Sequence, residues 1–114
     1  MTVLLTGGAG YIGSHVAVEL LQSGYDVIIA DNFYNSSQEV PKRIRKITEK
    51  SVRTYNVDIQ NSAALEQIFK QHEINAVMHF AGYKAVGEAV QQPLKYYRGN
   101  LDSTLTLLET MGKY

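Results

Sequence analysis

Four glycines near the amino terminus have the spacing of a phosphate-binding loop. Gly7, Gly8, Gly10 and Gly13 follow a short apolar run and precede a segment of helical periodicity. They form Gly8-x-Gly10-x-x-Gly13 and, overlapping it, Gly7-x-x-Gly10-x-x-Gly13. In such loops the early glycines adopt backbone angles closed to other residues, the middle one lets a pyrophosphate approach, and the last lets helix pack on strand. The N–H groups and positive dipole end of the following helix then face the phosphates, so the pattern predicts a dinucleotide site.

A carboxylate follows the next apolar run. Asp31 lies at about the spacing of 20 residues expected for the acid that binds the adenosine ribose. It can accept two hydrogen bonds from ribose hydroxyls, and its charge repels a 2′-phosphate, which favours NAD over NADP. Because Asn32, Asn35 and Ser36 lie beside it, the alternative role of Asp31 is a cap of the local turn.

A second carboxylate, Asp58, comes just after the third apolar run. It is placed either to accept the adenine amino group or to cap the turn into the helix near Asn61 and Ser62, and the residues alone leave both roles open. The histidines, at positions 15, 72 and 79, lack metal-ligand spacing. We therefore predict packing or surface roles for them and no metal site.

Composition narrows the class of protein. The chain has 114 residues, and 11 Lys plus Arg balance 11 Asp plus Glu, so no net field attracts nucleic acid or anionic lipid. The basic run from Lys42 to Lys50 has no interleaved aromatic residues and is predicted to be a solvated helix face. The absence of cysteine excludes disulfides, and the apolar runs are too short to span a bilayer. We expect a soluble, cytoplasmic protein that binds neither nucleic acid nor membrane.

The hydrophobic pattern alternates between strand and helix. Strands are predicted at residues 2–6, 26–30, 52–57 and 74–80. Helices are predicted after the glycine loop as far as Gly24, from a capping box at Ser36 and Glu39 to about Lys50, around Leu65 to His72, and from near Pro93 onward. The apolar stripe of the last helix is Leu101, Leu105 and Leu108. The fold class is α/β: a truncated, doubly wound Rossmann-type parallel sheet of about four strands with helices on both faces.

Three segments of the sequence resemble the UDP-glucose 4-epimerases, a family of the extended short-chain dehydrogenase/reductase group. They are residues 4–15, 30–36 and 79–88, and Pro93-Leu94 and Tyr96-Tyr97 follow the third. The glycine loop is shared by the whole group, whereas residues 79–88 are more specific to the epimerases. The resemblance covers the whole chain and about the first third of a full-length family member. We therefore expect residues 1–114 to be the N-terminal part of an NAD-binding Rossmann domain.

The resemblance implies NAD as the cofactor and assigns a set of residues to it. Those matched to the pyrophosphate loop, the adenosine ribose, the adenine and the cofactor-lining fourth strand are Gly7, Gly10, Tyr11, Ile12, Gly13, Asp31, Asn32, Asn35, Ser36, Asp58, Ile59, Phe80, Ala81, Gly82 and Lys84. Asn100 matches the asparagine that steadies the final helix and is counted with them. Lys84, Ala85 and Val86 are also implied to face the nucleotide sugar. The chain departs from the family at Ala89, where serine is common, and at Gly99, where some members carry an asparagine near the cofactor.

The activity implied by the resemblance is the interconversion of UDP-glucose and UDP-galactose in galactose metabolism. The family works through a 4-keto sugar and needs a Tyr-x-x-x-Lys pair, whose lysine lowers the pKa of the tyrosine that exchanges the hydroxyl proton. No tyrosine in this sequence has a lysine four residues later, so we assign no catalytic residue and expect these residues alone to be inactive. The family also implies a possible homodimer. The alternatives are a stand-alone NAD-binding module and another nucleotide-sugar dehydratase or epimerase of the same group.

Overall fold

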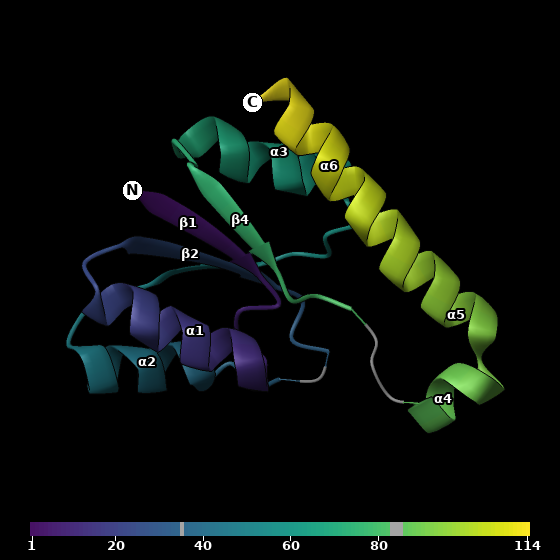
Figure 1. Ribbon diagram of the computed structural model, residues 1–114, viewed down its shortest axis with the longest axis horizontal. Helices are drawn as coiled ribbons and strands as arrows, with labels where there is room; N and C mark the ends of the chain where they lie inside the picture. The colour runs from purple at the N-terminus through teal and green to yellow at the C-terminus, as the bar shows by residue number, and fades with distance from the viewer. Residues whose placement is uncertain (35, 83–85) are drawn as a thin grey trace.

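A four-stranded parallel sheet with helices on both faces forms the fold (Figure 1). The computed structural model describes residues 1–34, 36–82 and 86–114. The strands are β1 (Thr2–Thr6), β2 (Asp26–Asp31), β3 (Arg53–Asn56) and β4 (Ala76–His79), in the order β3-β2-β1-β4. The helices are α1 (Tyr11–Gln22), α2 (Val40–Thr48), α3 (Ser62–Gln71), α4 (Val86–Gln91), α5 (Pro93–Tyr97), the π-helical turn η1 (Arg98–Asp102) and α6 (Ser103–Lys113). This arrangement confirms the predicted doubly wound class. Within the described ranges, no helix is both long and apolar enough to cross a membrane.

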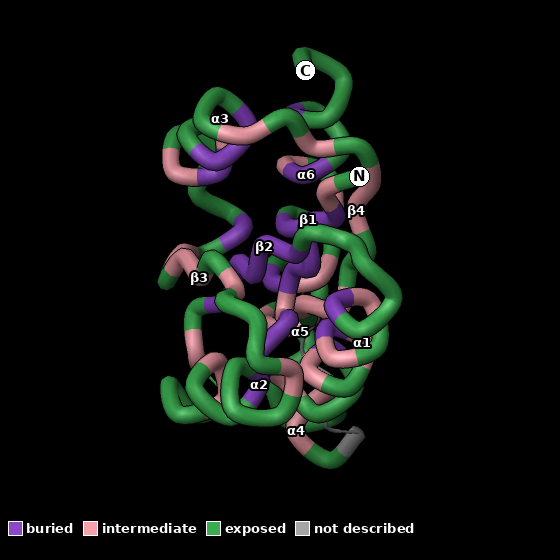
Figure 2. Tube along the Cα trace, turned by 90° about the vertical axis from the view of Figure 1, so that its left-hand side faces the viewer, coloured by how far each residue is buried: buried purple, intermediate pink, exposed green. Residues whose placement is uncertain are grey.

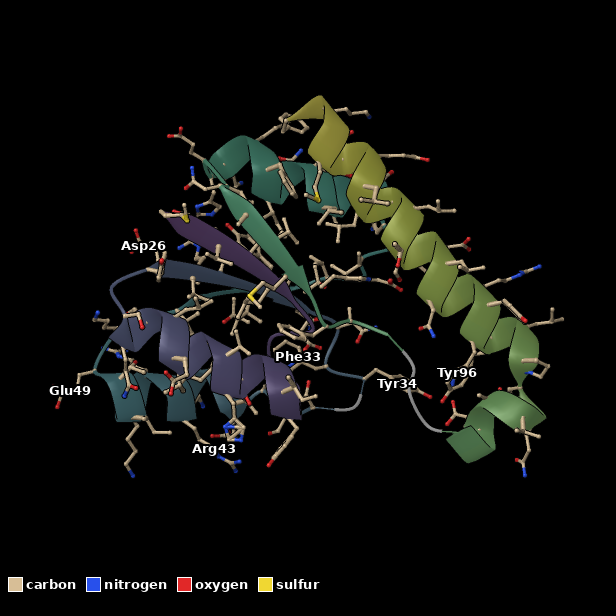
Figure 3. The ribbon with its side chains drawn as sticks, viewed as in Figure 1. Asp26, Phe33, Tyr34, Arg43, Glu49 and Tyr96 are labelled. Carbon is tan, nitrogen blue, oxygen red and sulfur yellow. The ribbon has the colours of Figure 1, made fainter. Side chains whose placement is uncertain are left out.

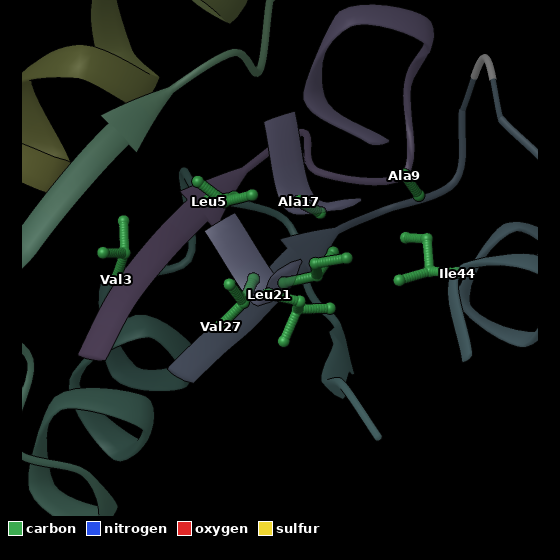
Figure 4. Packing of buried hydrophobic residues seen from close by; sticks show 8 residues of the cluster. Val3, Leu5, Ala9, Ala17, Leu21, Val27 and Ile44 are labelled. Atoms are coloured by element: carbon green, nitrogen blue, oxygen red, sulfur yellow. The ribbon is translucent and has the colours of Figure 1, made fainter. Parts of the chain in front are cut away.

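Two hydrophobic cores lie on opposite faces of the sheet because side chains alternate along each strand. On one side, Leu5 and Ile29 pack with Leu21 of α1 and Ile44 of α2 (Figure 4). On the other, Leu4 packs among residues of α3 and α6. Burial is concentrated on β1 and β2, and the outer faces of the helices are exposed (Figure 2). The central strands therefore hold the ends of the sheet rigidly, which matters because the predicted site lies at one of those ends.

The final helix differs from the sequence prediction in two ways: it is divided into three segments, and its apolar stripe faces outward. The helix consists of α5, η1 and α6 in succession. Within the stripe, Leu105 is 56% exposed and Leu108 57%, while Ser103, Leu107 and Thr110 are buried. Apolarity alone therefore does not mark the buried side of this helix. On the inner side, Leu107 belongs to the core cluster that includes residues of α3, and the smaller Ser103 and Thr110 are buried on the same helix.

The start of α2 also differs from the prediction. Ser36 does not cap this helix, because its hydroxyl donates to Asp31 Oδ1 over 3.4 Å, and α2 begins at Val40. The hydroxyl of Ser37 accepts instead from the Glu39 amide over 3.1 Å. The N-cap position of α2 is Glu39, so Ser36 stands too early in the chain to accept from the amides of the first turn.

The Thr54 hydroxyl in β3 is buried and has no hydrogen-bond partner among the described residues. We expect Thr54→Val to raise the free energy of unfolding by about 1 kcal/mol, because valine removes an unsatisfied polar group and suits a strand. Urea unfolding would show a higher midpoint with an unchanged slope. The matched control is Thr48→Val, which should lower the midpoint because the Thr48 hydroxyl donates to Ile44 O over 2.8 Å. A lower midpoint for Thr54→Val would contradict the prediction.

Candidate nucleotide-binding site

A cleft of about 360 Å³ lies at the carboxyl edge of the sheet. The chain runs from β1 outward through β2 to β3 and then returns to place β4 on the other side of β1. Ligands of doubly wound sheets bind at such a switch in strand order. The cleft is lined from the β1–α1 loop, the ends of β2, β3 and β4, and the last helix, by Gly7, Gly10, Tyr11, Ile12, Gly13, Asp31, Asn32, Tyr34, Ser36, Asp58, Ile59, Gln60, Phe80, Ala81, Gly82, Gly99 and Ser103.

The predicted cofactor residues in the described ranges meet in this cleft, with Asn100 as the exception. Asn100 is not among the lining residues, but its side chain lies next to one of them: a Cβ built on Gly82 would be 3.0 Å from Asn100 Oδ1. Asn35, Lys84 and Ala85 lie outside the described residues, as does the side chain of Val86. Sequence reasoning did not assign Tyr34, Gln60 and Ser103 to the site, and it noted Gly99 only as a departure from the family. None of these four belongs to a recognisable motif.

The glycine loop brings the start of α1 to the cleft. Gly7 has φ +67°, and its amide donates to Ala30 O over 2.8 Å, which joins the loop to the end of β2. Gly10 is the N-cap residue of α1 and donates to Gly7 O over 3.0 Å. No side chain in the described part of the chain caps this helix start. The amides of the first turn therefore face the cleft, where they can bind an anion.

Asp31 fixes the conformation of the cleft wall that follows β2. Its Oδ1 accepts from the Phe33 amide over 2.7 Å, and its Oδ2 accepts from the Ala9 amide over 3.1 Å. The residue is 8% exposed. The turn-capping role that the sequence left open is therefore present, and the same carboxylate also lines the cleft. The Ser36 hydroxyl also donates to Oδ1, and since a carboxylate offers about four lone-pair sites, these three bonds still leave capacity for a ligand hydroxyl.

Asp58 shapes the turn at the end of β3. Its Oδ1 accepts from the Gln60 amide over 2.9 Å, while its carbonyl accepts from the Asn61 amide. The cap of α3 is Asn61, whose side chain accepts from the Ala64 amide over 3.2 Å. Asp58 therefore stabilises the turn before α3 and is not the N-cap of that helix. It also lines the cleft beside Ile59.

His79 connects the end of β4 to β1 and to α6 through its two ring nitrogens. Its Nδ1 lies 2.5 Å from Thr6 Oγ1, and its Nε2 lies 3.2 Å from Thr104 Oγ1. Thr6 Oγ1 also accepts from the Ala81 amide over 3.4 Å. The imidazole thus links β1, β4 and α6 next to Phe80 and Ala81 in the chain, and the residue is exposed, in line with the packing or surface role predicted from the sequence.

Tyr34 reaches from the β2–α2 loop to the helices on the far side of the cleft. Its hydroxyl accepts from Lys95 Nζ over 2.6 Å, and Lys95 also pairs with the Glu88 carboxylate. The hydrogen bonds that the Lys95 ammonium group donates to Glu88 and to Tyr34 raise its pKa above the ordinary value. In Figure 3, Tyr34 and Tyr96 face one another, while Phe33 points back toward the sheet. Lys95 follows Tyr34 by 61 residues, so this contact could not be predicted from local spacing in the sequence.

Comparison with known proteins agrees with this geometry. The profile of the GDP-mannose 4,6 dehydratase family matches residues 4–114. The chain belongs to this family. Among its relatives, the UDP-glucose 4-epimerase of Bacillus subtilis is 53% identical over 114 residues, which are 100% of this chain and 34% of the relative. The mouse UDP-glucose 4-epimerase is 52% identical over 115 residues, covering 96% of this chain and 33% of the relative.

Solved structures in the family have the same architecture. The UDP-glucose 4-epimerase of Bifidobacterium longum, crystallised with NAD+ and UDP, superimposes with a TM-score of 0.98 at 50% identity. The match covers 99% of this chain and 34% of that structure. The chain thus spans about a third of the length of the relatives it matches. The Rossmann architecture expected from the sequence and the resemblance to the epimerases are both confirmed.

Proposed function

We propose that the cleft binds NAD and that the chain is the NAD-binding part of a UDP-sugar 4-epimerase. One observation carries the first half of this proposal: the uncapped start of α1 and the Asp31 carboxylate open into the same cleft. Backbone amides suit a pyrophosphate, and a carboxylate suits ribose hydroxyls. The B. longum relative binds NAD+ and UDP in its crystal, which supports the same class of ligand here.

The cleft residues fit the adenosine half of a dinucleotide. The glycines of the loop have no side chains, so a pyrophosphate can approach the main chain closely beside the α1 amides. Asp31 accepts from ribose hydroxyls, and Asp58, on the neighbouring strand end, accepts from the adenine amino group. Donors and acceptors thus follow the order of the chemical groups along the dinucleotide.

When bound, NAD supplies an acceptor for a hydride from the sugar. The described residues bind and orient the dinucleotide: the α1 start holds its phosphates, and Phe80 and Ala81 wall the side that continues toward β4. We extend the proposal to Lys84, Ala85 and Val86 as contacts of the nucleotide sugar, and to Asn35 as a further ribose contact. These assignments rest on the resemblance to the epimerases.

The reaction itself is proposed for the whole protein. UDP-glucose and UDP-galactose are its proposed substrates, because the chain is 53% identical to the epimerase of B. subtilis over all 114 residues. Residues 1–114 correspond, in this proposal, to the N-terminal part of the NAD-binding domain. We also propose the cytoplasm as its location. The homodimer implied by the resemblance stays a prediction.

Calorimetry with the purified chain tests the proposed binding. We expect NAD+ to bind at least about ten times more tightly than NADP+, because Asp31 repels a 2′-phosphate. ADP-ribose should bind nearly as well as NAD+, since the described contacts are to the adenosine and phosphate groups. Equal affinities for NAD+ and NADP+ would contradict the role of Asp31, and failure of a folded chain to bind either would refute the site.

The family is described as GDP-mannose 4,6 dehydratase, so dehydration of GDP-mannose is a second candidate reaction. The two reactions differ in nucleotide and product, so one assay separates them. The whole protein, incubated with UDP-galactose and with GDP-mannose, should convert only the first, to UDP-glucose. Formation of a 4-keto-6-deoxy sugar from GDP-mannose would favour the dehydratase instead.

A further inference from the structure

A cluster of side chains joins two walls of the cleft. Tyr34 comes from the wall that holds Asp31, Asn32 and Ser36, whereas Lys95 belongs to α5, which leads directly into η1 on the opposite wall. Lys95 Nζ lies 2.6 Å from the Tyr34 hydroxyl and 4.7 Å from the centre of its ring. The contact therefore combines a hydrogen bond with a cation–π interaction.

Glu88 of α4 completes the cluster. Its carboxylate pairs with the same ammonium group, and the side chains of Lys95 and Glu88 are only 28% and 34% exposed. The pair is thus partly shielded from water, which makes it stronger than a fully exposed ion pair. Because the two charges balance, the cluster holds the walls together without presenting a net charge to a phosphate.

The backbone conformation of Phe33 directs the next side chain, that of Tyr34, toward α5. Phe33 has φ +59°, a left-handed conformation that costs energy for a residue with a bulky side chain. The hydrogen bond from its amide to Asp31 Oδ1 stabilises that conformation, and its ring packs against the core. The two neighbouring side chains consequently diverge, with Phe33 directed inward and Tyr34 directed toward α5 (Figure 3).

We propose that Tyr34, Lys95 and Glu88 form a clasp that sets how fast a dinucleotide enters and leaves the cleft. This inference rests on the proposed binding of NAD. The clasp bonds join protein groups to one another, so their strength is the same whether or not a dinucleotide lies in the cleft. Weakening the clasp then lowers the barrier to entry and to exit equally, and the two rates rise by one factor while Kd stays unchanged, as for a gating step.

Stopped-flow kinetics with NADH tests the clasp. NADH is excited in the near ultraviolet, where protein side chains do not absorb, so its fluorescence reports association directly, and displacement by excess NAD+ gives the dissociation rate. We expect Lys95→Met and Glu88→Gln, at two positions that do not line the cleft, each to raise both rates about five- to tenfold, with Kd changed less than about twofold. Lys95→Arg should restore slow exchange to within about threefold of wild type, because a guanidinium can pair with Glu88 and stack on Tyr34.

The matched control is Lys42→Met, which removes an exposed ammonium group that lies 3.5 Å from Glu39 on α2. It should leave both rates unchanged. Circular dichroism verifies that each variant is folded, and Glu88→Gln alone tests the clasp if Lys95→Met does not fold. Unchanged rates in the variants, or faster dissociation alone with a proportionally weaker Kd, overturn the clasp. A folded wild-type chain that binds no NADH overturns the proposed function, and the clasp with it.

Discussion

Replacing Asp31 with alanine is expected to weaken NAD+ binding about 10- to 100-fold, equivalent to about 1 to 3 kcal/mol. The carboxylate is buried and accepts from the Phe33 and Ala9 amides, so its loss removes a ribose acceptor and also frees the loops on either side. Calorimetry on the folded variant gives the affinity. Urea unfolding should show a parallel loss of stability, because the buried Ala9 amide and the partly buried Phe33 amide lose their acceptor.

Two further variants separate the effect of charge from the effect of position. Asp31→Asn keeps one oxygen that can accept from Phe33 but removes the charge, so it should reduce the preference for NAD+ over NADP+. Asp26→Ala changes an exposed aspartate at the other end of the same strand and should leave both affinities unchanged. If Asp31→Ala binds NAD+ as tightly as wild type, Asp31 is only a structural residue of the turn.

Gly13→Ala is expected to abolish NAD+ binding and to cost about 3 kcal/mol of stability. A Cβ at this position would lie 2.5 Å from Gly7 O and 2.8 Å from the Gly8 Cα. Both are backbone atoms, so α1 would have to move away from the loop, which overpacked sites resist at a cost of about 1 to 3 kcal/mol or more. The movement also withdraws the first-turn amides from the phosphates.

Urea unfolding and calorimetry together measure this effect. Gly112→Ala is the matched control: this glycine also lies in a helix, and a Cβ there would meet no described atom within 4 Å. Alanine should leave NAD+ binding intact at that position and stabilise α6 slightly, since it is the better helix former. Wild-type affinity in Gly13→Ala would show that the close approach of α1 to the loop is not required.

The strands and the first helix were predictable because their signals are local. The apolar residues of β1 and β2 stand in continuous runs, and the glycine loop announces both the end of β1 and the start of α1. The predicted positions of β3 and β4 are correct, but both predictions extend one or two residues too far at their ends. The reason is that pairing with a neighbouring strand, rather than apolarity, decides where a strand stops.

The site was predictable in part for a similar reason. Gly10, Asp31, Asp58 and Phe80 each follow or end a predicted strand, and parallel topology brings the carboxyl ends of strands to one edge. Tyr34 and Ser103 line the same cleft but belong to no local pattern, so their positions could not be inferred from spacing. Spacing was also misleading for Ser36, whose hydroxyl bonds to a carboxylate five residues earlier instead of capping α2.

The amino-acid sequence by itself determined the order of elements, the phosphate loop and the acids that follow the strands, since these depend on residue type and short-range spacing. Only the tertiary structure decided that the leucine stripe of the last helix faces outward, that Asp31 binds two loops at once, and that Tyr34 meets Lys95. The physical reason is that each of these outcomes is a competition among partners distant in the chain. Such a competition is settled by packing and hydrogen bonding once the sheet has assembled.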